Sequence, residues 1–246
     1  MQHQPLILAL LAGLTLSGAA QAALHDRGGG LIYDDVLNVT WLADANYART
    51  SGYDDDGLMT WDQAMTWAAN LSYYDSVRNV TYDDWRLPTI TDTGTPGCNW
   101  DYSGTDCGYN VQTVSGSTVY SELAHMYYNN LGFKGGYSPT GDYQPDFGIF
   151  GNGTSGGERD GLGPNGAINN LQSSVYWSGT EYAPDTDDAW LFYTGNGFQG
   201  LGDKTAEVYA WAVRPGDVAA VPEPEMYALL LAGLGLVGVA TRRRRG

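Results

Sequence analysis

Two apolar stretches occupy the ends of the 246-residue chain, and the residues between them are expected to form a water-soluble domain. The first runs from Leu6 to about Leu16, and the second runs from Met226 to Ala240. All 28 acidic and 12 basic residues lie outside these stretches. We therefore expect one folded domain over residues 24–217, followed by a Pro/Ala-rich linker over residues 218–225.

The N-terminal stretch has the pattern of a secretory signal peptide over residues 1–22. Small residues follow the apolar run and end in Ala20-Gln21-Ala22, which is the kind of site that signal peptidase cleaves. The run is too short to cross a bilayer, which needs about 20 apolar residues. We therefore expect export.

The C-terminal stretch predicts a transmembrane helix over residues 226–241. Its apolar part spans roughly 22 Å as a helix, and arginine side chains can bridge the remaining distance to a hydrocarbon layer of about 30 Å. The cluster Arg242, Arg243, Arg244 and Arg245, within residues 242–246, is expected on the cytoplasmic side. A buried core helix is the alternative, but such a helix would not run directly into four exposed arginines.

Three features in a fixed order resemble the PEP-CTERM sorting signal of Gram-negative bacteria. They are Pro222-Glu223-Pro224, an apolar helix and a terminal arginine cluster. The resemblance implies that exosortase recognises Pro222, Glu223 and Pro224 at the inner membrane and removes the tail. It also implies a protein of the cell surface or of the exopolysaccharide and biofilm matrix.

The charge of the domain argues against one class of partner. Without the tail the chain has 8 basic and 26 acidic residues, which gives a net charge of −18. Nucleic-acid binding relies on lysines and arginines that neutralise phosphates, so we expect no nucleic-acid partner. Hard cations such as calcium, or neutral sugars, suit this surface better.

The order of expected elements predicts an α+β domain. These elements are two strands around an Asp-Asp turn within residues 30–47, a helix over 60–71, a short strand at 83–88, a helix over 120–132 and several strands within 174–216. Thr60 and Gln63 form a capping box for the first helix, and Ser121 and Gly132 bound the second. The apolar face of the first helix is expected to be Trp61, Ala64, Met65, Ala68 and Leu71.

Five segments in this order resemble the Lcl C-terminal domain family: "GLIYDDVLNVTWLADA", "MTWDQAMTWAANL", "WRLPT", "SVYWSGTEY" and "AWAVRPG". The resemblance covers most of residues 31–216. It implies a C-type-lectin-like fold with two helices flanking a twisted antiparallel sheet. In the family a helix tends to follow "WRLPT" directly, whereas here a long insertion separates it from residue 120.

Cys98 and Cys107 lie in that insertion, and in an exported protein they are expected to form a disulfide. Closing so short a loop contributes roughly 2–3 kcal/mol. A catalytic or metal-binding thiol is the alternative, but it would need a histidine nearby in the sequence.

Asp54, Asp56 and Asp62 cluster around the turn-forming Gly57 and make a candidate calcium site. The spacing is not that of an EF-hand loop. A solvated acidic turn before the helix is the alternative, because aspartates are favourable near a helix N-terminus.

Three aromatic residues of the insertion are candidates for carbohydrate binding, because sugar C–H faces pack on aromatic rings. Trp100, Tyr102 and Tyr109 show no core periodicity. The tryptophans at positions 61, 85, 177, 190 and 211 fall in expected helices and strands and are predicted to be core residues.

Catalytic signatures are absent from the sequence. We find no serine-hydrolase, metalloprotease or phosphate-loop motif, and we predict no His–carboxylate neighbourhood. The expected function is therefore a non-enzymatic, exported protein that binds polysaccharide or builds a matrix. An envelope enzyme that acts on polysaccharide with a carboxylate pair is the alternative.

Overall fold

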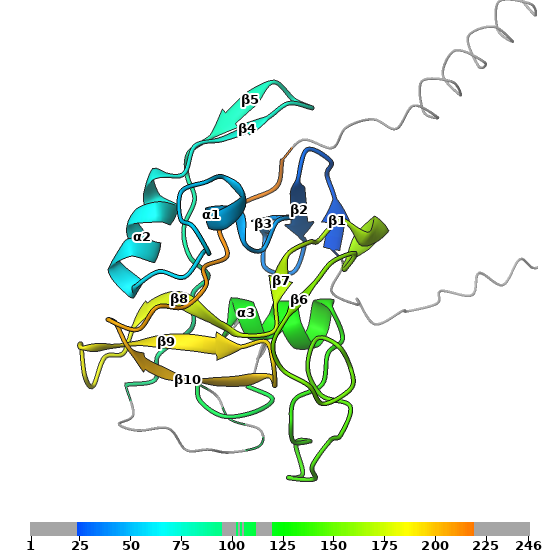
Figure 1. The fold of residues 1–246 in the computed structure, drawn as a ribbon, viewed down its shortest axis with the longest axis vertical. Helices are drawn as coiled ribbons and strands as arrows, with labels where there is room; N and C mark the ends of the chain where they lie inside the picture. The colour runs from blue at the N-terminus through cyan, green and yellow to red at the C-terminus, as the bar shows by residue number, and fades with distance from the viewer. Residues whose placement is uncertain (1–23, 95–101, 103, 105, 112–119, 219–246) are drawn as a thin grey trace, which may run out of the picture.

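The computed structural model describes residues 24–94, 102, 104, 106–111 and 120–218, and their regular secondary structure consists mostly of β-strands with few helices (Figure 1). Among these residues, the buried core positions lie between Leu31 and Val218, so this part of the chain encloses its own core. In chain order the elements are β1 (Leu24–Asp26), β2 (Leu31–Asp34), β3 (Val39–Leu42), α1 (Tyr47–Thr50), α2 (Trp61–Asn70), β4 (Tyr73–Asp75), β5 (Val80–Tyr82), α3 (Glu122–Ala124), the π-helix η1 (His125–Asn130), β6 (Glu158–Arg159), the 3-10 helix η2 (Pro164–Gly166), β7 (Leu171–Gln172), β8 (Val175–Glu181), β9 (Asp188–Tyr193), β10 (Phe198–Asp203) and β11 (Val213–Pro215).

One antiparallel sheet has the order β1-β2-β3-β11, so strands from both ends of the described chain lie side by side (Figure 1). β2 and β3 confirm the two strands predicted around the Asp-Asp turn. Asp34 shapes this turn, because its Oδ1 accepts the backbone N–H groups of Val36 and Leu37, each at 3.0 Å. Asn38 follows with a φ of +54°, which asparagine tolerates better than most residues.

A second antiparallel sheet, β10-β9-β8, confirms the strands predicted in the C-terminal third. Trp177 and Trp190 lie on β8 and β9 and are fully buried. Trp177 Nε1 donates a hydrogen bond to the carbonyl of Met59 at 2.9 Å, which ties this sheet to the segment before α2. Trp85 and Trp211 are also core residues, as predicted, whereas Trp61 is only half-buried.

The α2 helix begins with the predicted capping box. Thr60 Oγ1 accepts the backbone N–H of Gln63, and Gln63 Oε1 accepts the backbone N–H of Thr60 at 2.9 Å. The predicted apolar face is only partly right. Ala64, Ala68 and Leu71 are buried, but the large side chain on this face is Trp67, while Trp61 and Met65 remain half-buried.

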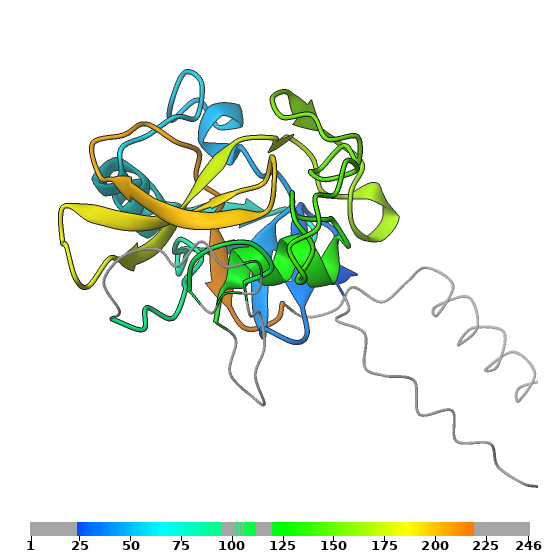
Figure 2. The ribbon, with the colours of Figure 1, turned by 90° about the horizontal axis from the view of Figure 1, so that it is seen from below.

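The second predicted helix is present, but most of it is not α-helical. Ser121 caps α3 by accepting the N–H of Ala124 at 3.1 Å, and the chain then continues as the π-helix η1. Gly132 follows the last turn with a φ of +66°, which confirms it as the predicted stop. Figure 2 shows α3 and η1 alongside the sheet that contains β2, and Asn130 at the end of η1 bonds to Asp34 at the end of β2.

The prediction of a short strand at residues 83–88 is wrong. Only Arg86 makes a bridge there, to Val213, and the rest of the segment is irregular. The hairpin that β4 and β5 form immediately before this segment was not predicted. The Arg86 guanidinium group fixes this position, because it forms a bidentate salt bridge with the Glu122 carboxylate of α3 at 2.6 and 2.8 Å.

Candidate functional site

Aromatic side chains from the segment before α3 and from the loop after η1 contact one another, and the loop after η1 extends below the sheets in Figure 1. The tyrosine cluster consists of Tyr102, Tyr109, Tyr137, Tyr143 and Phe147. Tyr137 is its centre, because the ring centroids of Tyr102, Tyr109 and Tyr143 lie 5.1, 5.2 and 5.8 Å from that of Tyr137. Phe147 extends the cluster, with its centroid 6.1 Å from that of Tyr143.

Two rings of the tyrosine cluster face solvent, and the others support them. Tyr143 is 62% exposed and Tyr102 is 41% exposed, whereas Tyr109, Tyr137 and Phe147 are half-buried. Exposed aromatic surface of this kind marks interaction sites in loops that a rigid scaffold positions.

The structure brings two of the predicted carbohydrate-binding residues, Tyr102 and Tyr109, into one cluster, and Trp100 lies outside the described residues. Tyr137 and Tyr143 were not among the predicted residues. The signal that found Tyr102, an aromatic residue in a loop without core periodicity, is equally present in "GGYSPTGDYQPDF" and would have found them.

Asn110 holds the two halves of the tyrosine cluster together. Its Nδ2 donates to the carbonyls of Tyr102 at 2.7 Å and Tyr137 at 2.8 Å. Gly141 lets the loop tip approach the Tyr102 ring, because a Cβ at this position would lie 3.0 Å from ring atoms and its φ is +88°. The cluster is therefore fixed by side-chain bonds and close backbone contact.

Hydroxyl and carboxylate groups border the exposed rings. Tyr137 and Tyr143 form an antiparallel bridge, and the turn between them carries Ser138, Thr140 and Asp142. Thr140 Oγ1 donates to Asp142 Oδ2 at 2.7 Å. Rings that accept the C–H face of a sugar, next to groups that bond its hydroxyls, form a surface able to bind polysaccharide.

Asp146, next to Phe147 of the tyrosine cluster, does not have the raised pKa of a general acid. Lys134 Nζ lies 2.5 Å from Asp146 Oδ2, and this hydrogen bond lowers the pKa of Asp146 below its ordinary value. Glycoside hydrolysis by a carboxylate pair needs one carboxylic acid with a raised pKa. Asp146 is shifted in the opposite direction.

The candidate calcium residues form a hydrogen-bonded turn. Asp54 Oδ1 accepts the N–H groups of Asp56 at 3.1 Å and Gly57 at 2.7 Å. Slight burial raises the pKa of Asp54, but these backbone bonds outweigh it and the net pKa is lowered. Asp62 lies in the first turn of α2. Within the described part of the chain, no group of three or more His, Cys, Asp or Glu side chains is arranged to hold a metal ion, and calcium binding stays a prediction.

Cys107 is fully buried in a small cluster with Ile90, Tyr182, Trp190 and Phe198. Its predicted partner, Cys98, lies outside the described residues, so the disulfide stays a prediction.

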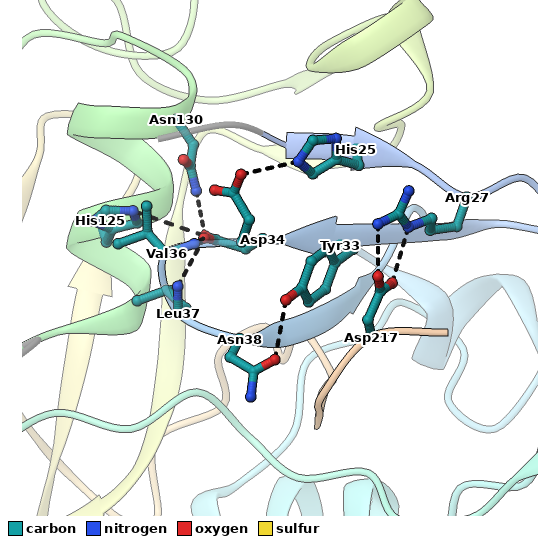
Figure 3. Close-up of polar contacts among 11 residues, drawn as sticks. His25, Arg27, Tyr33, Asp34, Val36, Leu37, Asn38, His125, Asn130 and Asp217 are labelled. Carbon is teal, nitrogen blue, oxygen red and sulfur yellow. Dashed lines mark hydrogen bonds and ion pairs between the residues drawn. The ribbon is translucent and has the colours of Figure 1, made fainter. Parts of the chain in front are cut away.

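The part of the chain that the structure describes contains two His–carboxylate pairs, so the prediction of none is wrong (Figure 3). His25 Nε2 lies 3.0 Å from Asp35 Oδ2 at the surface, and His125 Nε2 lies 3.9 Å from Asp34 Oδ2 in the interior. In the buried pair, His125 is the first residue of η1 and Asp34 is the last residue of β2. Only the folded chain brings them together.

The buried pair is a structural feature. Asp34 is 0% exposed and His125 is 1% exposed, so a substrate cannot touch either group. Burial raises the pKa of Asp34 and lowers the pKa of His125. Asp34 Oδ2 accepts Asn130 Nδ2 at 2.5 Å, whereas neither ring nitrogen of His125 has a hydrogen-bond partner among the described residues.

Comparison with known families finds the PEP-CTERM protein-sorting motif at residues 220–245. The match contains Pro222, Glu223, Pro224 and the arginine cluster, all of which lie outside the described residues. The motif marks an exported protein that exosortase processes at the membrane. No curated protein and no solved structure matches the chain.

No family match supports the resemblance of residues 31–216 to the Lcl C-terminal domain, so this resemblance stays a prediction. No helix in the part of the chain that the structure describes is long and apolar enough to cross a membrane, and the predicted span at residues 226–241 lies outside that part.

Proposed function

We propose that the exported domain is a non-enzymatic polysaccharide-binding protein of the cell surface or exopolysaccharide matrix. The observation that carries this proposal is the tyrosine cluster, in which Tyr102 and Tyr143 expose their rings beside hydroxyl and carboxylate groups. The proposal includes the C-type-lectin-like architecture that the sequence resemblance implies.

Two other features support binding to a sugar polymer. The sorting motif marks an exported protein that is processed at the membrane, and export would bring the domain into contact with extracellular polysaccharide. The exposed rings lie on loops whose positions are fixed by Asn110, so little conformational entropy is lost when a ligand binds.

Replacing Tyr102 and Tyr143 together by alanine is expected to lower affinity for the producer's exopolysaccharide by about tenfold or more, since each ring contact is worth about 1 kcal/mol. The measurement is retention of residues 24–218 on the immobilised polymer, with and without calcium. Because Tyr143 is mostly exposed, the variant should unfold at nearly the same temperature as the original protein.

Tyr74→Ala is the matched control. Tyr74 is 58% exposed and belongs to β4, which lies at the opposite end of the molecule from the loops of the cluster in Figure 1. This variant should bind as the original protein does. The proposal fails when the original domain is not retained in either calcium condition. Release of reducing ends from the polymer, lost on replacing Asp142 and Asp146 by asparagine, would instead favour the envelope-enzyme alternative.

A further inference from the structure

A cavity of about 390 Å³ lies beside the tyrosine cluster. It is formed where the loop after Phe147 meets the start of β8 and the end of β9, and its walls include Phe147, Ser155, Ser173, Ser174, Tyr193 and Asn196. Phe147 belongs to both the cavity and the tyrosine cluster, so the two are contiguous. The volume is within the range of small-molecule sites, which begins at about 300 Å³.

None of the side chains that line this cavity carries a formal charge, although the domain has a strong net negative charge. Two other cavities differ in this respect, because Arg159 lines one near β1 and Asp44 lines one near α1. Serine hydroxyls and the Asn196 amide are both donors and acceptors, so they match the hydroxyl groups of a sugar. A buried carboxylate or ammonium group would find no partner of opposite charge here.

Ser173 supplies an unused hydrogen-bonding group at this cavity. It is 3% exposed, and its Oγ has no hydrogen-bond partner among the described residues. Its backbone is fixed on both sides, because its N–H donates to the carbonyl of Gly157 at 2.8 Å and its own carbonyl accepts the N–H of Gly156 at 2.9 Å. A buried polar group without a hydrogen-bond partner lowers the stability of the fold. A ligand that bonds to the Ser173 hydroxyl would offset this loss.

Gly195 keeps the cavity open. A Cβ at this position would lie 3.2 Å from Ser155 Cβ, which is closer than most such contacts, and 3.4 Å from Ser173 Oγ. The rings of Phe147 and Tyr193 are half-buried in the same walls and offer faces for sugar C–H groups. The site therefore combines aromatic faces, hydroxyl groups and space for one sugar ring.

We propose that this cavity binds one neutral sugar unit of the polysaccharide whose neighbouring units lie on the tyrosine cluster. This inference rests on the proposed function and adds the class of sugar, which is an uncharged pyranose rather than a uronic acid or an amino sugar. The Ser173 hydroxyl bonds to a hydroxyl group of the bound unit.

Ser173→Ala separates binding from stability. Because Ser173 Oγ has no partner to lose, the variant should unfold at the same temperature as the original protein or at a higher one. Its affinity for the best of the methyl glycosides of glucose, galactose and mannose should fall about fivefold or more, the loss of one hydrogen bond to the ligand. Titration calorimetry on residues 24–218 measures this affinity, and glucuronic acid and glucosamine should bind more weakly than the best neutral glycoside.

Ser121→Ala is the matched control, since Ser121 is equally buried but bonds to Gln199 at 2.6 Å and to the N–H of Ala124. This variant should lose stability and keep its affinity. The inference is overturned when Ser173→Ala binds as the original protein does, when none of the neutral glycosides binds, or when the charged sugars bind equally well. If retention on the polymer still depends on Tyr102 and Tyr143 in that case, the proposed function holds and only the sugar site at Ser173 is rejected.

Discussion

Replacing Asp34 by alanine is expected to lower the free energy of unfolding by about 3 kcal/mol, because it leaves buried donors without acceptors. The Asp34 carboxylate accepts the N–H groups of Val36 and Leu37 and the side-chain amide of Asn130. It also lies 3.9 Å from His125 in the interior (Figure 3). Through these bonds it fixes the turn between β2 and β3 and attaches η1 to that turn.

Asp34→Asn is the matched control, because asparagine keeps the shape of the side chain and one acceptor oxygen for the N–H groups of the turn. The Oδ1 atom of Asn130 is buried and has no partner among the described residues. A flip of the Asn130 amide would let this oxygen accept a hydrogen bond from the new side chain, and we expect a loss of about 1 kcal/mol or less. Urea unfolding followed by circular dichroism measures both variants, and equal stabilities for the alanine and asparagine variants would contradict this account.

Replacing Pro222, Glu223 and Pro224 together by alanine is expected to stop removal of the tail. Because proline disfavours a helical backbone at its own position and at the residue before it, we expect the motif to be accessible to exosortase. Nearly all of the protein should then remain in the inner-membrane fraction with its arginine cluster attached. Cell fractionation with mass determination of the C-terminal peptide measures this result.

The control for the sorting motif is Glu225→Ala, which changes the next residue and leaves Pro222, Glu223 and Pro224 in place. This variant should be processed normally. Processing of the triple variant at the original rate would show that the cleavage does not depend on the motif.

Elements that depend on neighbouring residues were predictable from the sequence. The turn between β2 and β3 and the capping box of α2 are local, because each is formed by residues within a few positions of one another. The sorting motif was also predictable, since its three parts follow one another along the chain.

Features that depend on distant segments were not predictable in the same way. Trp67 is buried because the rest of the fold covers that side of α2, which helical periodicity alone does not specify. The Asp34–His125 pair joins segments that are far apart in the sequence. The cavity at Ser173 arises from loops that meet only in the folded chain. Its unpaired hydroxyl cannot be recognised from the sequence.

The mass of the protein recovered from the producer's extracellular polysaccharide tests the central claim most directly. The account predicts a chain that begins at Ala23, lacks Arg242 to Arg245 and is bound to the polymer until competing sugar releases it. Recovery of the intact chain, with both terminal segments, from the cytosol and none from the polymer would contradict it.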